Sequence, residues 1–140
     1  MVDAVLVPMD GSEMSERALE YALEVFPDAD ITALHVVGEP SPMWARATGI
    51  ALADDIEASA REHAEEVFER AREIAADADD VELDTRVALG HPVRAIVDRA
   101  ADYETVVIGS HGGNVADRIF VGNVAEKVFR RSPVPVVVVR

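Results

Sequence analysis

The sequence predicts a single α/β domain over residues 1–140, with a parallel sheet covered by helices on both faces. Short apolar runs typical of strands alternate with longer segments whose apolar residues recur at helical spacing. This alternation gives the order βαβαβαβαβ, which is typical of parallel sheets. Most of the strand-like runs are apolar throughout, as expected for strands covered on both faces. No internal repeat or interior linker divides the chain.

The elements follow one another with short connections. The first strand is expected at residues 4–7, and the first helix at 14–26, where Met14, Ala18 and Ala22 share a face. The other expected elements are a strand at 31–37, a helix at about 50–76, a strand at 81–87, a helix at about 92–101, a strand at 105–108, a helix at about 124–131 and a strand at 134–139. The run at 81–87 alternates apolar and polar residues, which indicates an edge strand.

Composition excludes several classes of protein. Asp and Glu total 27 against 13 Lys and Arg, the net charge is −14, and Lys127 is the single lysine. Such an acidic surface argues against nucleic-acid binding and fits a protein that works at high salt, where self-repulsion is screened. The chain has no cysteine, so thiol catalysis and zinc-thiolate sites are excluded. The short apolar runs predict no membrane span, and we expect a cytoplasmic protein.

The stretch GSHGGNVADRIFVGN at residues 109–123 carries the strongest functional signal. Three of its glycines, Gly109, Gly112 and Gly122, have the spacing G-x-x-G-x9-G and follow a predicted strand. Glycine lets a ligand approach the backbone closely, and a helix start favours anions. In open α/β sheets, ligands bind beyond the carboxyl ends of strands where the strand order reverses. A phosphate-binding loop is one interpretation, and His111 is a candidate hydrogen-bond donor to a phosphate within it.

A purely structural interpretation of the same stretch stays open. Asn123 and Glu126 have the spacing of a capping box at the start of the last helix, and the glycines would then only form a turn. His35 and His63 are interpreted as core histidines. Neither Ser12 nor Ser110 has a base beside it in the sequence, so nucleophilic catalysis has no support. No pair of histidines has the spacing of metal ligands.

Five segments make the sequence resemble the universal stress protein family along nearly its whole length. They are VLVPMDGSEMSERAL near the start, LHVV at 34–37, GHPVRAI at 90–96, VVIGSHG at 106–112 and GNVAEKVFRRSPVPVVVV near the end. In that family the G-x-x-G-x9-G pattern is the ATP-binding signature. The resemblance implies a five-stranded parallel sheet of order 3-2-1-4-5 with a Rossmann-like fold. It also implies a stress-response role, and the composition marks an acidic, haloarchaeal-type member.

The resemblance implies roles for individual residues. Asp10 matches the acidic residue that contacts the nucleoside, Val36 the backbone position that reads adenine, and Gly109 the residue beside the ribose. The positions that match phosphate-holding residues are Gly112, Gly122, Asn123 and Val124, and those that line the same cleft are Pro8 and Ser110. Mg²⁺ would be held through the phosphates of ATP. No catalytic residue and no metal-ligating residue is expected.

Two positions depart from the family pattern. Asn123 stands where the family usually has Ser or Thr, and Gly113 stands where a basic residue is common. The first hypothesis is therefore an ATP-binding protein that acts through protein partners, and the alternative is a nucleotide-free dimeric interaction protein. Slow ATP hydrolysis is a third possibility, although the chain offers no obvious base to orient water. The resemblance also implies a homodimer paired through the last strand, from Val134 to Val139.

Overall fold

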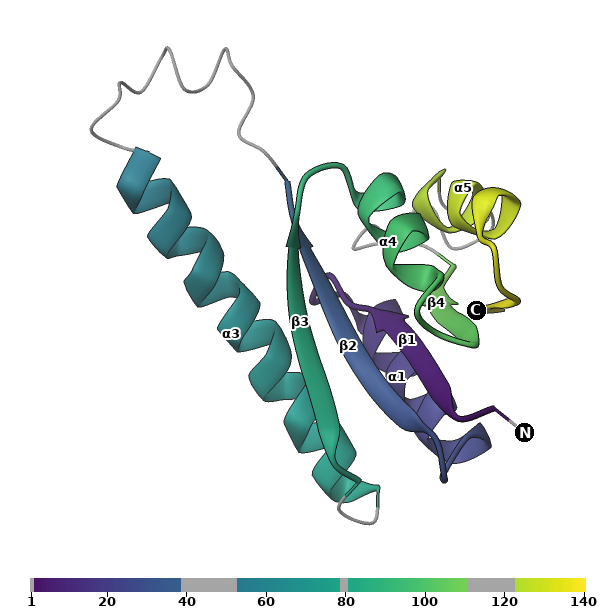
Figure 1. Cartoon of the computed structure of the whole chain (residues 1–140). Coiled ribbons are helices and arrows are strands. Elements are labelled where there is room, and N and C mark those ends of the chain that lie inside the picture. Colours follow the sequence, from purple (N-terminus) through teal and green to yellow (C-terminus); the bar gives the residue numbers. More distant parts are fainter. Residues whose placement is uncertain (1, 39–52, 79–80, 111–122) are drawn as a thin grey trace.

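The predicted alternation of strands and helices is present in the computed structural model, which describes residues 2–38, 53–78, 81–110 and 123–140. Five strands and four helices are found there (Figure 1). The strands are β1 (Ala4–Pro8), β2 (Asp30–Val37), β3 (Leu83–Leu89), β4 (Thr105–Gly109) and β5 (Val136–Val139). The helices are α1 (Glu13–Val25), α3 (Ala53–Asp77), α4 (Pro92–Ala100) and α5 (Asn123–Arg131).

The sheet is parallel and has the order β3-β2-β1-β4-β5, as the resemblance implied. β1 lies at the centre and pairs with β2 from Ala4 opposite Asp30 to Pro8 opposite Leu34. β3 and β5 form the two edges. β5 begins at Val136, two residues later than predicted, because the preceding Pro135 has no amide hydrogen for the ladder. The strand order reverses between β1 and β4, which places the expected ligand position beyond their carboxyl ends.

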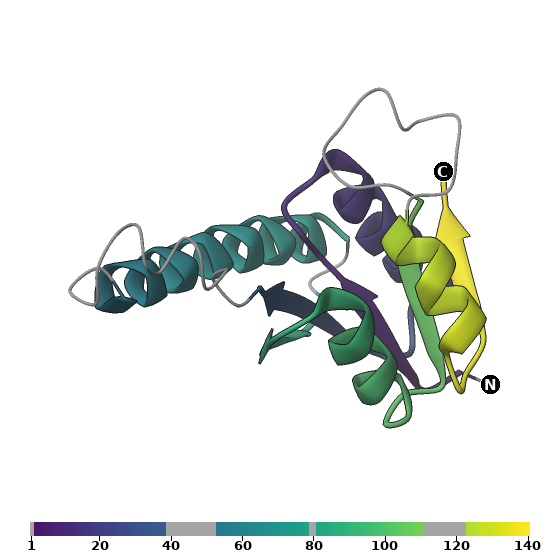
Figure 2. The same cartoon turned by 90° about the horizontal axis from the view of Figure 1, so that it is seen from above.

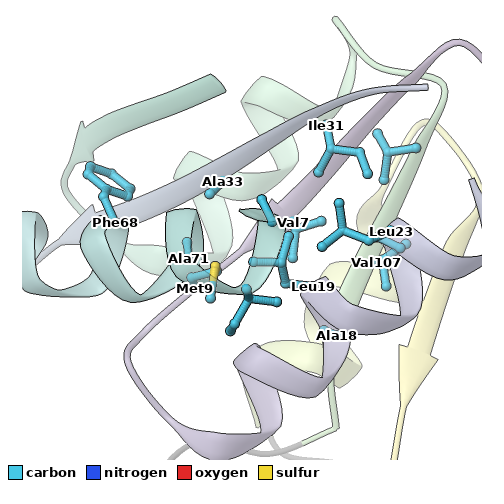
Figure 3. Close-up of a cluster of buried hydrophobic side chains, with 14 of the residues drawn as sticks. Val7, Met9, Ala18, Leu19, Leu23, Ile31, Ala33, Phe68, Ala71 and Val107 are labelled. Carbon is cyan, nitrogen blue, oxygen red and sulfur yellow. The ribbon is translucent and has the colours of Figure 1, made fainter. Parts of the chain in front are cut away.

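Helices α1 and α3 cover one face of the sheet, over the larger of two hydrophobic cores (Figure 2). Figure 3 shows this core, in which Leu19 and Leu23 of α1 lie against Val7, Ile31 and Val107 of the strands. All five of these side chains are buried. The N-terminal turns of α3 project past the sheet (Figure 2), so the helix covers the strands mainly through its C-terminal part.

Helices α4 and α5 cover the opposite face, over a smaller core. Val93 and Ile96 of α4 and Val128 of α5 pack there with Leu6 and Val106 of the central strands. No helix in the described ranges is long and apolar enough to cross a bilayer.

Candidate functional site

A cavity of about 280 Å³ lies beyond the carboxyl ends of β1 and β4, on the side of the smaller core. Its volume is close to the lower end of small-molecule pockets, which begin at about 300 Å³. Within the described ranges, the lining comes from six elements and their turns, and the residues are Pro8, Met9, Asp10, Ser12, Ser15, Leu34, Val36, Pro92, Ile96, Ile108, Gly109, Asn123, Val124 and Ala125. The cavity therefore occupies the position that the strand order predicts for a ligand.

Aliphatic side chains form most of the cavity wall. Leu34 and Val36 of β2 lie on the face of the sheet that carries the smaller core, and Ile96 of α4 and Ile108 of β4 line the cavity with them. Leu34, Ile96 and Ile108 are buried, and Val36 is half-buried. Such a wall suits a flat apolar group, for example a purine ring, better than a charged one.

The turn between β1 and α1 places polar groups at the cavity. Asp10 is exposed, and its Oδ1 accepts a hydrogen bond of 2.9 Å from the Ser12 amide. Gly11 has φ +84°, a left-handed conformation that glycine adopts without strain. The Ser12 Oγ then caps α1 by accepting a bond of 3.2 Å from the Ser15 amide. The turn is thus fixed on the C-terminal side of Asp10, with one carboxylate oxygen bound to the chain.

Gly109 ends β4 at the cavity and also allows a close contact between β4 and α1. A Cβ at this position would lie 2.8 Å from the Met14 carbonyl oxygen and 2.9 Å from its carbonyl carbon. These are backbone atoms of the first turn of α1, which cannot swing aside as a flexible side chain would. The absence of a side chain at Gly109 therefore has a packing cause as well as the expected ligand contact.

Helix α5 begins at Asn123, beside the cavity. Asn123 is thus the first residue of the helix as described, whereas the sequence placed the N-cap at this position. Among the hydrogen bonds of the described ranges, none joins the Asn123 side chain to the amides of Ala125 or Glu126. Asn123 is exposed and lines the cavity.

The structure brings together six of the ten residues expected at a nucleotide site, namely Pro8, Asp10, Val36, Gly109, Asn123 and Val124. Ser110 is 3% exposed and is not part of the cavity wall. His111, Gly112 and Gly122 lie outside the described residues, as does Gly113. The sequence analysis missed the apolar wall, including Leu34, Ile96 and Ile108. Leu34 and Ile108 belong to apolar strand runs and Ile96 to the apolar face of α4, so the sequence marks all three only as core residues.

The two histidines near the site differ in exposure. His35 is 6% exposed and its Nδ1 lies 2.8 Å from the Met9 carbonyl oxygen, which confirms its interpretation as a buried strand-end residue. His63 of α3 was expected on the buried face but is exposed. It lies at the flank of that face, where its ring contacts the His35 ring edge-on at 5.3 Å between centroids and leaves its other side in solvent. No three potential metal ligands come together within the described ranges.

Comparison with known proteins identifies relatives along the whole chain. Residues 1–140 match the model of the universal stress protein family. The universal stress protein YxiE of Bacillus subtilis is 31% identical over 149 aligned positions, which cover 100% of both chains.

Solved structures of the same family have this fold. The universal stress protein UspA of Lactobacillus plantarum superposes with a TM-score of 0.81 and is 26% identical, covering 99% of this chain and 98% of that one. A universal stress protein solved in complex with cAMP superposes with a TM-score of 0.71 at 26% identity, covering 99% and 97% of the two chains.

Proposed function

Because the chain belongs to the universal stress protein family, we propose that it binds ATP between β1 and β4 and acts in the stress response through protein partners. The observation that carries this proposal is the cavity, which combines an aliphatic wall with polar groups at the first turns of two helices. The related protein solved in complex with cAMP supports an adenine nucleotide as the ligand class.

Each part of the nucleotide has a counterpart in the described residues. The adenine ring would lie against Leu34, Val36 and Ile108, because an aliphatic wall favours a flat apolar group. The Asp10 carboxylate would accept hydrogen bonds from the ribose hydroxyls, since an ionised carboxylate accepts several bonds. The phosphates would lie near Asn123 at the start of α5, where the helix dipole and the first amides favour negative charge. Mg²⁺ would be held through the phosphates.

ATP binding is tested by calorimetry in about 2 M KCl, where the Debye length is near 3 Å or below and repulsion between the acidic protein and ATP is screened. We expect binding by the wild-type protein and strong loss of binding in Val36→Glu, because a carboxylate replaces the aliphatic wall. Val37→Glu is the matched control, since Val37 is the next residue of β2, is equally half-buried and lies outside the cavity wall. Absence of binding at millimolar ATP in the wild-type protein would refute the proposal and favour the nucleotide-free alternative.

The salt dependence of ligand affinity distinguishes the contribution of the phosphates from that of the nucleoside. The net charge of −14 opposes a polyanionic ligand and leaves a neutral one unaffected. ATP affinity should therefore rise between about 0.1 M and 2 M KCl, whereas adenosine affinity should change little. A fall in ATP affinity over this range would show that local attraction at the helix ends dominates instead.

We further propose that bound ATP undergoes little or no hydrolysis. Asp10 is the single ionisable side chain among the described lining residues, and its Oδ1 already accepts the Ser12 amide. Phosphate release by the wild-type protein is compared with release by Val36→Glu. A rate that exceeds this control by tenfold or more would identify the protein as an ATPase.

The proposed assembly is a homodimer formed through β5. The carbonyl oxygens of Pro135 and Val139 accept hydrogen bonds from the amides of Val106 in β4 and of Ser110 just after it. The backbone groups of Val136 and Val138 therefore point to the outer side of this edge strand. An exposed edge of this kind pairs readily with another strand. Val138→Pro removes one outward amide, and Val138→Thr keeps the amide and the side-chain shape. Light scattering should give a monomer for the proline variant and a dimer for wild type and Val138→Thr, and a monomeric wild-type protein would exclude this assembly.

A further inference from the structure

The backbone ladder between β1 and β2 ends just before the turn that carries Asp10. The last paired residues are Pro8 and Leu34, and the Met9 amide still donates to the Leu34 carbonyl oxygen at 2.8 Å. The Met9 carbonyl is the next acceptor along the chain, and it belongs to a residue that is only 3% exposed. It accepts from the Nδ1 of His35 at 2.8 Å. Because a carbonyl oxygen only accepts, this imidazole nitrogen carries the hydrogen.

His35 reaches this carbonyl from the face of the sheet opposite the cavity. Its neighbours Leu34 and Val36 line the cavity, and side chains of successive strand residues point to opposite faces. The His35 ring is held edge-on by Phe68 of α3, with 6.4 Å between ring centroids, and by His63. The imidazole is therefore fixed by packing in the larger core while its nitrogen holds the backbone next to Asp10.

Helix α3 also limits where the turn can lie. A Cβ added to Gly11 would approach the Val67 Cγ2 to 3.3 Å and the His63 Cε1 to 3.7 Å. The turn thus rests on α3 at Gly11, one residue after Asp10, and is bonded to His35 at Met9, one residue before it. Asp10 therefore lies between Met9 and Gly11, and both of these residues contact side chains on the face of the sheet opposite the cavity.

We propose that His35 is a positioning residue for the ligand site: its Nδ1–H holds the Met9 carbonyl and so fixes the Asp10 carboxylate at the rim of the cavity. This inference rests on the proposed function, because it assigns to Asp10 the contact with the ribose. Removal of the donor leaves a buried carbonyl without a partner, which favours rearrangement of the turn toward water.

The test is a double-mutant cycle on ATP affinity, measured by calorimetry in about 2 M KCl. His35→Phe and Asp10→Ala should each weaken binding by about tenfold, the effect of one lost hydrogen bond to a buried or charged group. The double variant should also lose only about tenfold, because a displaced Asp10 has nothing left to contribute. An additive loss of about one hundredfold would show that His35 does not act through Asp10 and would overturn the proposal.

Two further variants separate positioning from general stability. His35→Asn keeps an N–H donor close to the Nδ1 position and should restore most of the affinity. Ile31→Val lies on the same face of β2, is buried, and should destabilise the protein by about 1 kcal/mol without weakening ATP binding. Equal loss of affinity in Ile31→Val would identify the effect as structural. If His35→Phe does not fold, His35→Gln replaces it, since its amide extends beyond the Nδ1 position.

Hydrogen exchange of the nucleotide-free protein tests the role of His35 independently of ATP binding. Amide hydrogen exchange at residues 9–12 should be faster by tenfold or more in His35→Phe than in wild type, and unchanged in Ile31→Val. If the wild-type protein binds no ATP, the proposed function fails, and the exchange result alone decides whether His35 holds the turn. Unchanged exchange in His35→Phe would refute the positioning role in either case.

Discussion

Gly109→Ala should destabilise the fold although it adds a single methyl group. The new Cβ would lie 2.8 Å from the Met14 carbonyl oxygen, so the first turn of α1 must move by several tenths of an ångström. Overpacking of this kind costs about 1–3 kcal/mol, and the reduced freedom of the unfolded chain offsets about 0.4–1 kcal/mol. We expect a net loss of about 1–2 kcal/mol, measured as the free energy of unfolding by urea titration of the ligand-free protein. The melting temperature should fall by about 3–7 °C in a domain of this size.

The matched control is Gly38→Ala. A Cβ at Gly38 meets nothing within 4 Å, and its φ is not in the left-handed region. This substitution should leave stability unchanged or raise it by a few tenths of a kcal/mol. If Gly109→Ala is as stable as Gly38→Ala, the close approach of β4 and α1 does not constrain this position, and the packing explanation is refuted.

Three further predictions concern the turn, the helix cap and the charge. Gly11→Ala should cost about 1–2 kcal/mol in urea titration, because φ is +84° and Val67 lies 3.3 Å from the new Cβ; wild-type stability would show that the turn relaxes freely. Ser12→Ala should cost about 1 kcal/mol through loss of the bond to the Ser15 amide, and Ser12→Asp should retain the cap; equal losses in both would exclude capping as the cause. The urea midpoint of the wild-type protein should rise between about 0.1 M and 2 M KCl, because screening weakens the repulsion of a net charge of −14; a flat profile would count against adaptation to high salt.

The fold could be predicted because local patterns and global topology agree. Continuous apolar runs predict β1, β2 and β4 as central strands. The alternating run at residues 81–87 predicts β3 as an edge strand, and the sheet order confirms both. Strand boundaries that depend on a single residue were predicted less well. β5 begins after Pro135 and not at the predicted residue 134. The strand order itself came from the family resemblance, since periodicity gives the elements without their arrangement.

The candidate site was predictable only in part, for physical reasons. Asp10 and Gly109 stand in polar, glycine-bearing segments after strands, which the sequence shows directly. Ile96 and Ile108 are indistinguishable in sequence from any buried aliphatic residue, and only the folded arrangement of α4 and β4 shows that they line the cavity. His35 was correctly interpreted as a buried residue, but its bond to Met9 joins residues 26 positions apart and has no local signature.

The cavity lies in the smaller of the two cores, where it is bordered by Gly109 and Ala125, two residues with little or no side chain. A larger side chain at Ala125 would fill part of the hollow from within the chain, whereas one at Gly109 would point toward Met14 of α1. The size of the side chain at the position equivalent to Ala125 is therefore a criterion that can be applied to aligned relatives. A small residue there leaves this space open for a ligand, and a bulky one fills it with the chain's own side chain.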